Sequence, residues 1–390
     1  MESEKENSSP LSVYEGLGTL LKTFNVSLQT ICKSLYFSNE TFCGNHSDDN
    51  GLQDYSEAIA MERFLSILVP ILFGIIIIAG LIGNTLVVIA VTCNPQMRST
   101  TNILIINLAI ADLLFIVFCV PFTAWDYSLP YWPFGDIWCR IVQYLIIVCA
   151  YASIYTLVLM SLDRFIAVVY PVTSISIRTE RNAYFAISLM WIVIFICCIP
   201  ALQAHGELHY EFAYTQYSVC VFLAIHGYNF AAYQICFFLS SYIIPLALIL
   251  CLYLSMLRRL WFGVTPGRHM SAESVKSKIR VTKMVVVVVV IFACCWCPIQ
   301  IMMVLKGLNA YGQSRTSILI QITAHILAYM NSCLNPILYA FLSDNFRKSF
   351  MKVFYRKPRP NFEAQRITKE KRDRDGTCAD KTTKVANNIP

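Results

Sequence analysis

Charge is scarce in this sequence. Only 14% of its 390 residues are Asp, Glu, Lys or Arg, and 56% are hydrophobic, whereas a soluble globular protein carries about 25% charged residues. The chain also lacks a nucleophile motif and metal-ligand spacing of its His, Cys and acidic residues, so we expect neither an enzyme nor a metal site. No similarity between two halves is visible, as inverted-repeat transporters would show, but a small-solute transporter remains the alternative from another class.

Long hydrophobic runs take the place of charge. Seven runs reach the length of about 20 residues that crosses a bilayer, and we expect an all-α membrane protein with a seven-transmembrane helix bundle over 64–341. Six consecutive valines in the sixth run are read as helix, because lipid offers backbone groups no other partner. The expected spans are 64–92, 101–127, 139–169, 183–203, 231–258, 280–306 and 316–341.

Basic residues predict the orientation. Of 31 Lys and Arg, 24 fall in the segments 93–100, 164–182 and 258–283 and in the tail after 341, which all lie on one side of the membrane. The other seven fall on the opposite side. The positive-inside rule therefore predicts a cytoplasmic C-terminus, an extracellular N-terminus and a multi-pass protein of the plasma membrane. No basic, apolar signal peptide opens the chain, so we expect the first helix to act as its own signal anchor.

The two tails differ from the bundle in composition. We expect residues 1–63 to be a disordered extracellular tail, and its four N-x-S/T sequons agree with glycosylation there. The polar, charged segment 358–390 is expected to be disordered and cytoplasmic. The sequons are at Asn7, Asn25, Asn39 and Asn45.

Most of the 16 cysteines lie inside the apolar runs, where cysteine is usually a small reduced hydrophobe. Cys139, at the outer mouth of the third helix, and Cys220, in the loop between the fourth and fifth helices, both face the oxidising side. We expect a disulfide between them, which would pin that loop across the bundle. Whether Cys32 and Cys43 form a second bridge in the tail is left open.

Polar residues inside the runs need a reason to be there, because a charge at the centre of a bilayer costs about 2.5–3.5 kcal/mol. For any one of them, interhelical hydrogen bonding is the simpler explanation. Together, an acid and several amides and hydroxyls would suit a hydrated Na⁺ at Asp112, the single cofactor that we expect. The expected polar core consists of Asn84, Asp112, Ser153, Asn331, Ser332 and Asn335.

The order of these features resembles the rhodopsin-like (class A) G-protein-coupled receptors over about residues 60–357. The resemblance rests on GN at 83–84, LAIAD at 108–112, "WPFG" after helix 2, DRF at 163–165, CWCP at 295–298 and NPILY at 335–339, and "SDNFRKSF" is similar to the family's amphipathic helix 8, expected at 342–357. Within the family, "SLPYWPFGDIWCRIVQY" and "LNPILYAFLSDNFRKSF" resemble the galanin and allatostatin-A receptor group.

The resemblance implies an activation switch at the cytoplasmic mouth. Asp163 would hold Arg164 at rest, and activation would free Arg164 to meet a heterotrimeric G protein. Lys278 stands where some members place an acid, so an interhelical lock with Arg164 is not expected. The implied switch residues are Asp163, Arg164, Tyr253, Phe292, Trp296, Pro298, Asn335, Pro336 and Tyr339.

Ligand class follows partly from what is missing. Ile146 stands where amine receptors carry an aspartate, and Tyr329 stands where opsins carry the retinal lysine. The resemblance implies instead a short amidated neuropeptide and Gi/Go coupling, with another peptide, somatostatin- or opioid-like, as the alternative. The expected ligand pocket is lined by Trp125, Asp126, Gln143, Tyr144, Gln300, Lys306, His325 and Tyr329.

Further partners follow from the same resemblance and from charge. Arrestin, receptor kinases and membrane lipid are expected partners, and nucleic acid is not, because the net charge of +7 comes from the cytoplasmic face. Asp126, Glu207 and Glu211 would attract a cationic peptide at the outer face.

Overall fold

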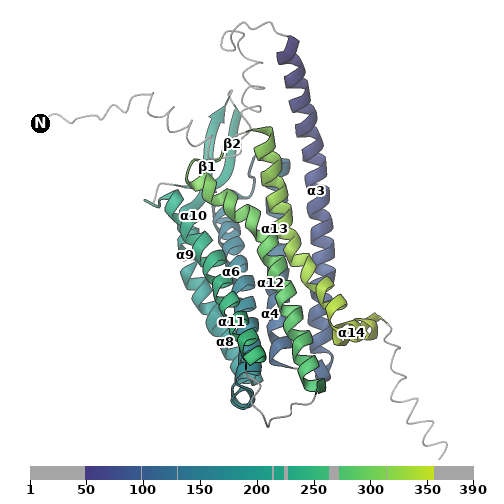
Figure 1. Ribbon diagram of the computed structural model, residues 1–390. Helices are drawn as coiled ribbons and strands as arrows, with labels where there is room; N and C mark the ends of the chain where they lie inside the picture. The colour runs from purple at the N-terminus through teal and green to yellow at the C-terminus, as the bar shows by residue number, and fades with distance from the viewer. Residues whose placement is uncertain are drawn as a thin grey trace, which may run out of the picture.

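The computed structural model describes the backbone of residues 49–354 except 98, 130, 213–214, 224–226, 263–271 and 313. The four sequons, Cys32, Cys43 and the tail from 358 lie outside the described residues. The first helix, α3 (Asp49–Thr92), begins inside the segment that was expected to be a disordered tail. Figure 1 shows this helix running past the rest of the bundle at one end.

Seven helical segments of the described chain are long and apolar enough to cross a membrane, and they match the seven expected runs to within a few residues. The match is close because span length and hydropathy are set by the bilayer itself. The helices after α3 are α4 (Thr100–Phe118), α5 (Val120–Ser128), α6 (Gly135–Val169), α8 (Glu180–Cys197), α9 (Ile199–Ala204), α10 (Phe230–Phe238), α11 (Ile244–Phe262), α12 (Ala272–Gly307) and α13 (Arg315–Leu342).

Helix α6 is the central element of the bundle. It packs against α4, α8, α11 and α12, and its buried residues continue along its whole length. Isoleucines of α3 such as Ile71, Ile75 and Ile78 are exposed instead. The polar features of α6 are therefore enclosed by protein, and the exposed apolar faces of the outer helices are left for lipid.

A two-stranded antiparallel hairpin covers one end of the bundle, where the sequence predicted only a loop. It consists of β1 (His205–Phe212) and β2 (Thr215–Phe222), with His205 opposite Phe222 and Glu207 opposite Cys220. Figure 1 shows the hairpin beside the upper ends of α10 and α13, opposite the end where α14 lies. We call these the hairpin end and the α14 end.

The fifth membrane-spanning segment contains a proline next to an irregular turn. Pro245 follows a π-helical segment, η3 (Leu239–Ile243), in which the N–H of Ile244 donates to the carbonyl of Leu239 five residues earlier. Proline has no N–H to continue the ordinary ladder, and single π turns often occur at functional sites. The extra residue per turn points Ser240 toward α6 and Ser241 toward α12, as their hydrogen bonds show.

Helix α14 (Asp344–Phe354) follows α13 and turns away from it in Figure 1, and it confirms the expected amphipathic helix 8. Phe346 is buried and stacks on Tyr339, with ring centroids 5.4 Å apart. Ser349 is also buried and accepts a hydrogen bond from Asn94 Nδ2 at 3.1 Å. The apolar side of α14 is therefore fixed to α13 and to the turn after α3.

Candidate functional site

The ion pair that the sequence placed at the end of α6 is part of a larger polar cluster, to which α4 and the residue after α7 also contribute side chains. The carboxylate of Asp163 accepts hydrogen bonds from Arg164 Nε at 3.0 Å and from the hydroxyl of Thr101 on α4 at 2.8 Å. Arg178, just after α7 (Ser174–Ile177), donates to the same carboxylate from Nε at 2.7 Å and from Nη2 at 3.2 Å. Asp163 and Arg164 are both buried.

Burial explains why one acid needs several partners. A buried carboxylate is strongly destabilising unless it is paired and its remaining lone pairs are bonded, and here two guanidinium groups and a hydroxyl meet those requirements. The sequence identified Asp163 and Arg164 but missed Thr101 and Arg178. Arg178 stands fifteen positions after Asp163, outside helical spacing, so only the path of the α7 segment brings the two together.

Two tyrosines expected to join the switch have hydroxyl groups without hydrogen-bond partners in the described part of the chain. Among the described residues, the buried hydroxyls of Tyr253 on α11 and Tyr339 on α13 have none. Unpaired buried hydroxyls are costly, so both are available to form new bonds if the helices move. The side chain of Lys278 lies outside the described residues, and the expected absence of an interhelical lock stays a prediction.

Asp112 forms the expected polar core in the middle of the bundle. It is fully buried, and its Oδ2 accepts a hydrogen bond from Asn335 Nδ2 at 2.9 Å. Asn84 Nδ2 donates to the carbonyls of Gly80 at 3.0 Å and Ser332 at 2.9 Å. Each side-chain donor therefore ties two helices together.

Several oxygens of this core are left without partners. Four buried oxygens of the polar core accept no hydrogen bond from the described residues. One carboxylate oxygen and several amide oxygens are the hard, neutral-to-anionic donors that alkali and alkaline-earth cations prefer. Ser153 and Ser332 are buried in the same region. The four oxygens are Asn84 Oδ1, Asp112 Oδ1, Asn331 Oδ1 and Asn335 Oδ1.

Two prolines expected to belong to the switch lie inside helices. Pro298 lies within α12, and Pro336 lies within α13 next to Asn335 of the polar core. A Cβ at Gly83 would lie 3.0 Å from Cβ of Pro336, so glycine permits α3 to approach the bend of α13. Phe292 and Trp296, two of the expected switch residues on α12, stack with their ring centroids 5.7 Å apart.

Trp296 and Ile154 of α6 both belong to the main buried cluster of the bundle. One turn further along α12, Gln300 Nε2 donates to Ser241 Oγ at 3.0 Å. Among the described residues, Trp296 Nε1 and Gln300 Oε1 have no partner. The π-helical segment is thereby bonded directly to α12, the helix that carries Trp296.

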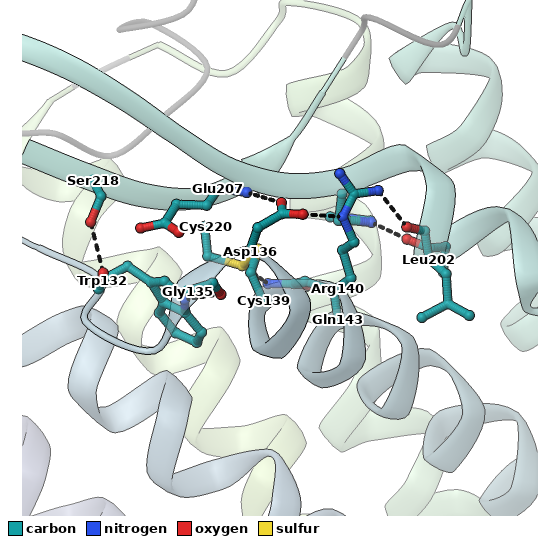
Figure 2. Close-up of a disulfide and its surroundings, with 12 residues drawn as sticks. Trp132, Gly135, Asp136, Cys139, Arg140, Gln143, Leu202, Glu207, Ser218 and Cys220 are labelled. Carbon is teal, nitrogen blue, oxygen red and sulfur yellow. Dashed lines mark hydrogen bonds and ion pairs between the residues drawn. A yellow bond between two sulfur atoms is a disulfide. The ribbon is translucent and has the colours of Figure 1, made fainter.

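The predicted disulfide between Cys139 and Cys220 is confirmed, and Figure 2 shows that it is one of several anchors for the hairpin. Asp136 accepts hydrogen bonds from the backbone N–H of Glu207 at 2.9 Å and from Arg140 Nε at 2.7 Å. Arg140 also donates to the carbonyl of Leu202 at 3.2 Å.

A second contact holds the other strand. Trp132 N–H donates to the carbonyl of Ser218 at 2.8 Å, and Ser218 Oγ donates back to the carbonyl of Trp132 at 2.7 Å (Figure 2). Both strands are therefore fixed to the start of α6 and the loop before it. The hairpin is a rigid cover and not a free loop.

The expected pocket residues divide into two groups. His325, Tyr329 and Lys306 share one network at the hairpin end, in which Tyr127 OH lies 3.0 Å from His325 Nδ1 and Thr123 Oγ1 lies 2.9 Å from Tyr329 OH. Gln300 lies deeper, at the π segment. Tyr127 and Thr123, one turn apart on α5, were missed by the sequence analysis.

The other expected pocket residues lie apart from this network. Tyr144 OH donates to the carbonyl of Phe195 at 3.0 Å, so Tyr144 faces α8. Trp125 bonds to the carbonyl of Tyr131 at 3.3 Å, in the loop before α6. Gln143 lies beside the disulfide, 3.8 Å from Cys220 Sγ, and Asp126 is exposed. Sequence spacing does not distinguish the face toward α8 from the face toward α13.

Comparison with known proteins agrees with this geometry. The family described as 7 transmembrane receptor (rhodopsin family) matches residues 83–339. The chain belongs to the rhodopsin family of seven-transmembrane receptors, so it is a multi-pass membrane receptor and neither an enzyme nor a transporter.

Individual relatives show which group within the rhodopsin family the chain is similar to. The chain is 56% identical to the allatostatin-A receptor of Bombyx mori, over 84% of this chain and 90% of that protein. It is 39% identical to galanin receptor 2a of Danio rerio, over 74% and 78%, and 36% identical to galanin receptor type 2 of Homo sapiens, over 74% and 73%. The expected resemblance to the galanin and allatostatin-A receptor group is confirmed.

Proposed function

We propose that this receptor binds a short amidated neuropeptide of the allatostatin-A type at its hairpin end and activates a heterotrimeric G protein, Gi or Go, at its α14 end. The observation that carries this proposal is the 56% identity to an allatostatin-A receptor over most of both chains. The network of aromatic and amide groups around Tyr127, His325 and Tyr329 supports it, because peptides are held by aromatic anchors and a few directed hydrogen bonds.

Orientation is part of the proposal. The hairpin end would be extracellular and the α14 end cytoplasmic, with the receptor in the plasma membrane. The charge count supports this, since most Lys and Arg fall at the α14 end, and a disulfide is stable on the oxidising side. Arrestin and receptor kinases would share the cytoplasmic surface.

Activation would be a shift between two states of the bundle. A peptide can shift the equilibrium only by the difference between its affinities for the two states. Coupling between the two sites is reciprocal: a bound G protein should raise the affinity for the peptide by the factor by which bound peptide raises the affinity for the G protein. Gln300 and Trp296 lie one turn apart on α12, and the hydroxyls of Tyr253 and Tyr339, which have no partner among the described residues, would form new hydrogen bonds in the active state.

The proposal includes a sodium ion in the polar core. Asp112, Asn331 and Asn335 carry the unpartnered oxygens that would hold it, and it would supply the positive charge that the buried carboxylate lacks.

The test is a screen of synthetic peptides on cells that express the chain with a promiscuous Gα subunit, read by calcium flux. We expect octapeptides that end in Phe-Gly-Leu-amide to act at lower concentration than galanin, somatostatin or opioid peptides, and pertussis toxin to block the response through native Gα. An Arg164→Leu variant controls for coupling, because it should keep peptide binding and lose the flux. Activation by somatostatin or opioid peptides alone would establish the alternative.

The expected attraction of a cationic peptide has its own test. Asp126 and Glu211 are both exposed at the hairpin end, so Asp126→Ala and Glu211→Ala should weaken radioligand binding at low salt. Unchanged affinity at low ionic strength would discard the idea, since screening is weakest there.

A further inference from the structure

Lys306, near the end of α12, is a half-buried cation without an anionic partner. Its Nζ donates a hydrogen bond to Gln321 Oε1 at 2.7 Å and lies 5.6 Å from the ring centroid of Tyr311. No carboxylate of the described part of the chain lies within 4.0 Å of it. An ammonium group has three N–H donors, so the receptor occupies only part of its bonding capacity.

The neighbours of Lys306 are neutral and held in place. Gln321 is buried, and its Nε2 donates to Tyr127 OH at 3.2 Å. His325 Nδ1 lies 2.9 Å from the carbonyl of Gln321 and 3.0 Å from Tyr127 OH. Because a carbonyl only accepts, Nδ1 carries the proton, and the imidazole is fixed in that tautomer.

This network fixes which way the amide of Gln321 points. Its NH₂ group faces Tyr127, so its oxygen faces Lys306. The ammonium group is therefore preorganised, and a ligand that binds it does not need to order it first.

The acids of the hairpin end lie on other elements. Asp136 is paired with Arg140, and the carboxylate of Glu207 lies 3.8 Å from His209. These acids and the exposed Asp126 and Glu211 belong to α5, α6 and β1, whereas Lys306 belongs to α12. The acids of this end are thus carried by α5, α6 and β1, and none of them is paired with Lys306 of α12.

We propose that Lys306, with Gln321 and Tyr311, is a subsite for a carboxylate side chain of the peptide. This rests on the proposed peptide function and adds the chemistry that one part of the peptide must present. A carboxylate of the peptide would supply the negative charge that no described residue places beside the half-buried ammonium group. The hydrogen bonds between the two charged groups would be stronger than those between neutral groups.

A lysine near a helix end can instead extend toward lipid headgroups. The contacts of Lys306 argue against that role. Its hydrogen-bond acceptor, Gln321, is buried among α12, α13 and α5, and its aromatic neighbour, Tyr311, is itself tied to the carbonyl of Ser317 at 2.5 Å. The ammonium group therefore points toward protein.

The test is a double-mutant cycle between peptide and receptor. The probes are octapeptides ending in Phe-Gly-Leu-amide that carry Asp or Asn at each of the preceding positions in turn. They are assayed on the wild type, Lys306→Met and Lys306→Arg. At one position, we expect Asp to be about tenfold more potent than Asn on the wild type, to lose that advantage on Lys306→Met and to keep most of it on Lys306→Arg.

Lys283→Met, an exposed lysine at the other end of α12, is the matched control and should leave every Asp/Asn ratio unchanged. Equal ratios on wild type and Lys306→Met at all positions would overturn the subsite. So would a Lys306→Met defect that appears only as altered stability in vesicles with anionic lipid. Failure of every peptide on the wild type would instead overturn the proposed function, so the two failures are distinguishable.

Discussion

Arg178 and Arg164 bond to the same carboxylate. Arg178 reaches both oxygens of Asp163, at 2.7 and 3.2 Å, while Arg164 bonds to Oδ2. The arginine of the switch therefore shares its only ionic partner among the described residues with a residue from the segment after α7. The position of α7 and of the residues next to it, among which Val172 and Ile175 are exposed, must affect how firmly Arg164 is held.

Loss of Arg178 should strengthen the ion pair between Asp163 and Arg164 and so stabilise the resting state. In Arg178→Met, the Oδ1 atom of Asp163 becomes free for a second hydrogen bond from Arg164, and the repulsion between the two guanidinium groups disappears. We expect agonist-independent nucleotide exchange to fall by about threefold, the size of a partly exposed ion pair. GTPγS binding to membranes with matched receptor density measures it.

The control is Arg178→Lys, which keeps the charge and should stay closer to the wild type. A rise in basal exchange in Arg178→Met would contradict the prediction, because it would mean that Arg178 holds Asp163 in place for Arg164.

Gly80 and Gly74 on α3 should respond oppositely to alanine. A Cβ at Gly80 would lie 2.3 Å from Cδ1 of Ile116 and 3.0 Å from Sγ of Cys333, whereas a Cβ at Gly74 meets nothing within 4 Å. We expect Gly80→Ala to destabilise the receptor by about 1–3 kcal/mol through overpacking. Gly74→Ala should be neutral or slightly stabilising.

Thermal unfolding of detergent-purified protein measures both variants. Ile116→Val removes the atom that the new methyl group meets, so it should restore part of the stability of Gly80→Ala. No recovery in the double variant would mean that the overlap with Ile116 is not the cause.

Sodium should stabilise the receptor through Asp112. We expect the melting temperature of the purified wild type to rise in NaCl relative to the same concentration of N-methyl-D-glucamine chloride, because a bound ion stabilises the folded state by mass action. Asp112→Asn removes the charge and should abolish the difference between the two salts. An equal sodium effect in Asp112→Asn would exclude this site.

His205 should make the hairpin sensitive to acid. The buried imidazole lies outside the membrane-spanning segments, and burial lowers its pKa from 6.5 to about 4. It donates Nδ1–H to the carbonyl of Ala201 at 3.0 Å and packs on Phe222 and Tyr233. Between pH 6.5 and 4 the unfolded chain binds more protons than the folded one, so stability falls as the pH falls.

We expect the melting temperature to decrease across this window in the wild type and to change less in His205→Phe, which keeps the aromatic packing. His209→Phe, at an exposed position of the same strand, should retain the wild-type slope. Identical slopes in wild type and His205→Phe would contradict the prediction.

The sequence by itself determined the seven spans and the disulfide, and it singled out the polar residues inside the spans. These depend on properties that the chain carries locally: about 20 apolar residues to cross a bilayer, and polar groups that lipid does not tolerate without a reason. Asp112, Asp163 and Arg164 were therefore recognisable before any fold was known, and the structure buries all three.

Only the tertiary structure decided which residues meet. Thr101 and Arg178 reach Asp163 from α4 and from the segment after α7, and Lys306 meets Gln321 across two helices. The helical period predicts that a residue lies on some face of its own helix, but not which neighbour that face meets. Pairing between distant segments depends on how the helices pack and where the connecting segments run, and no spacing within one helix encodes it.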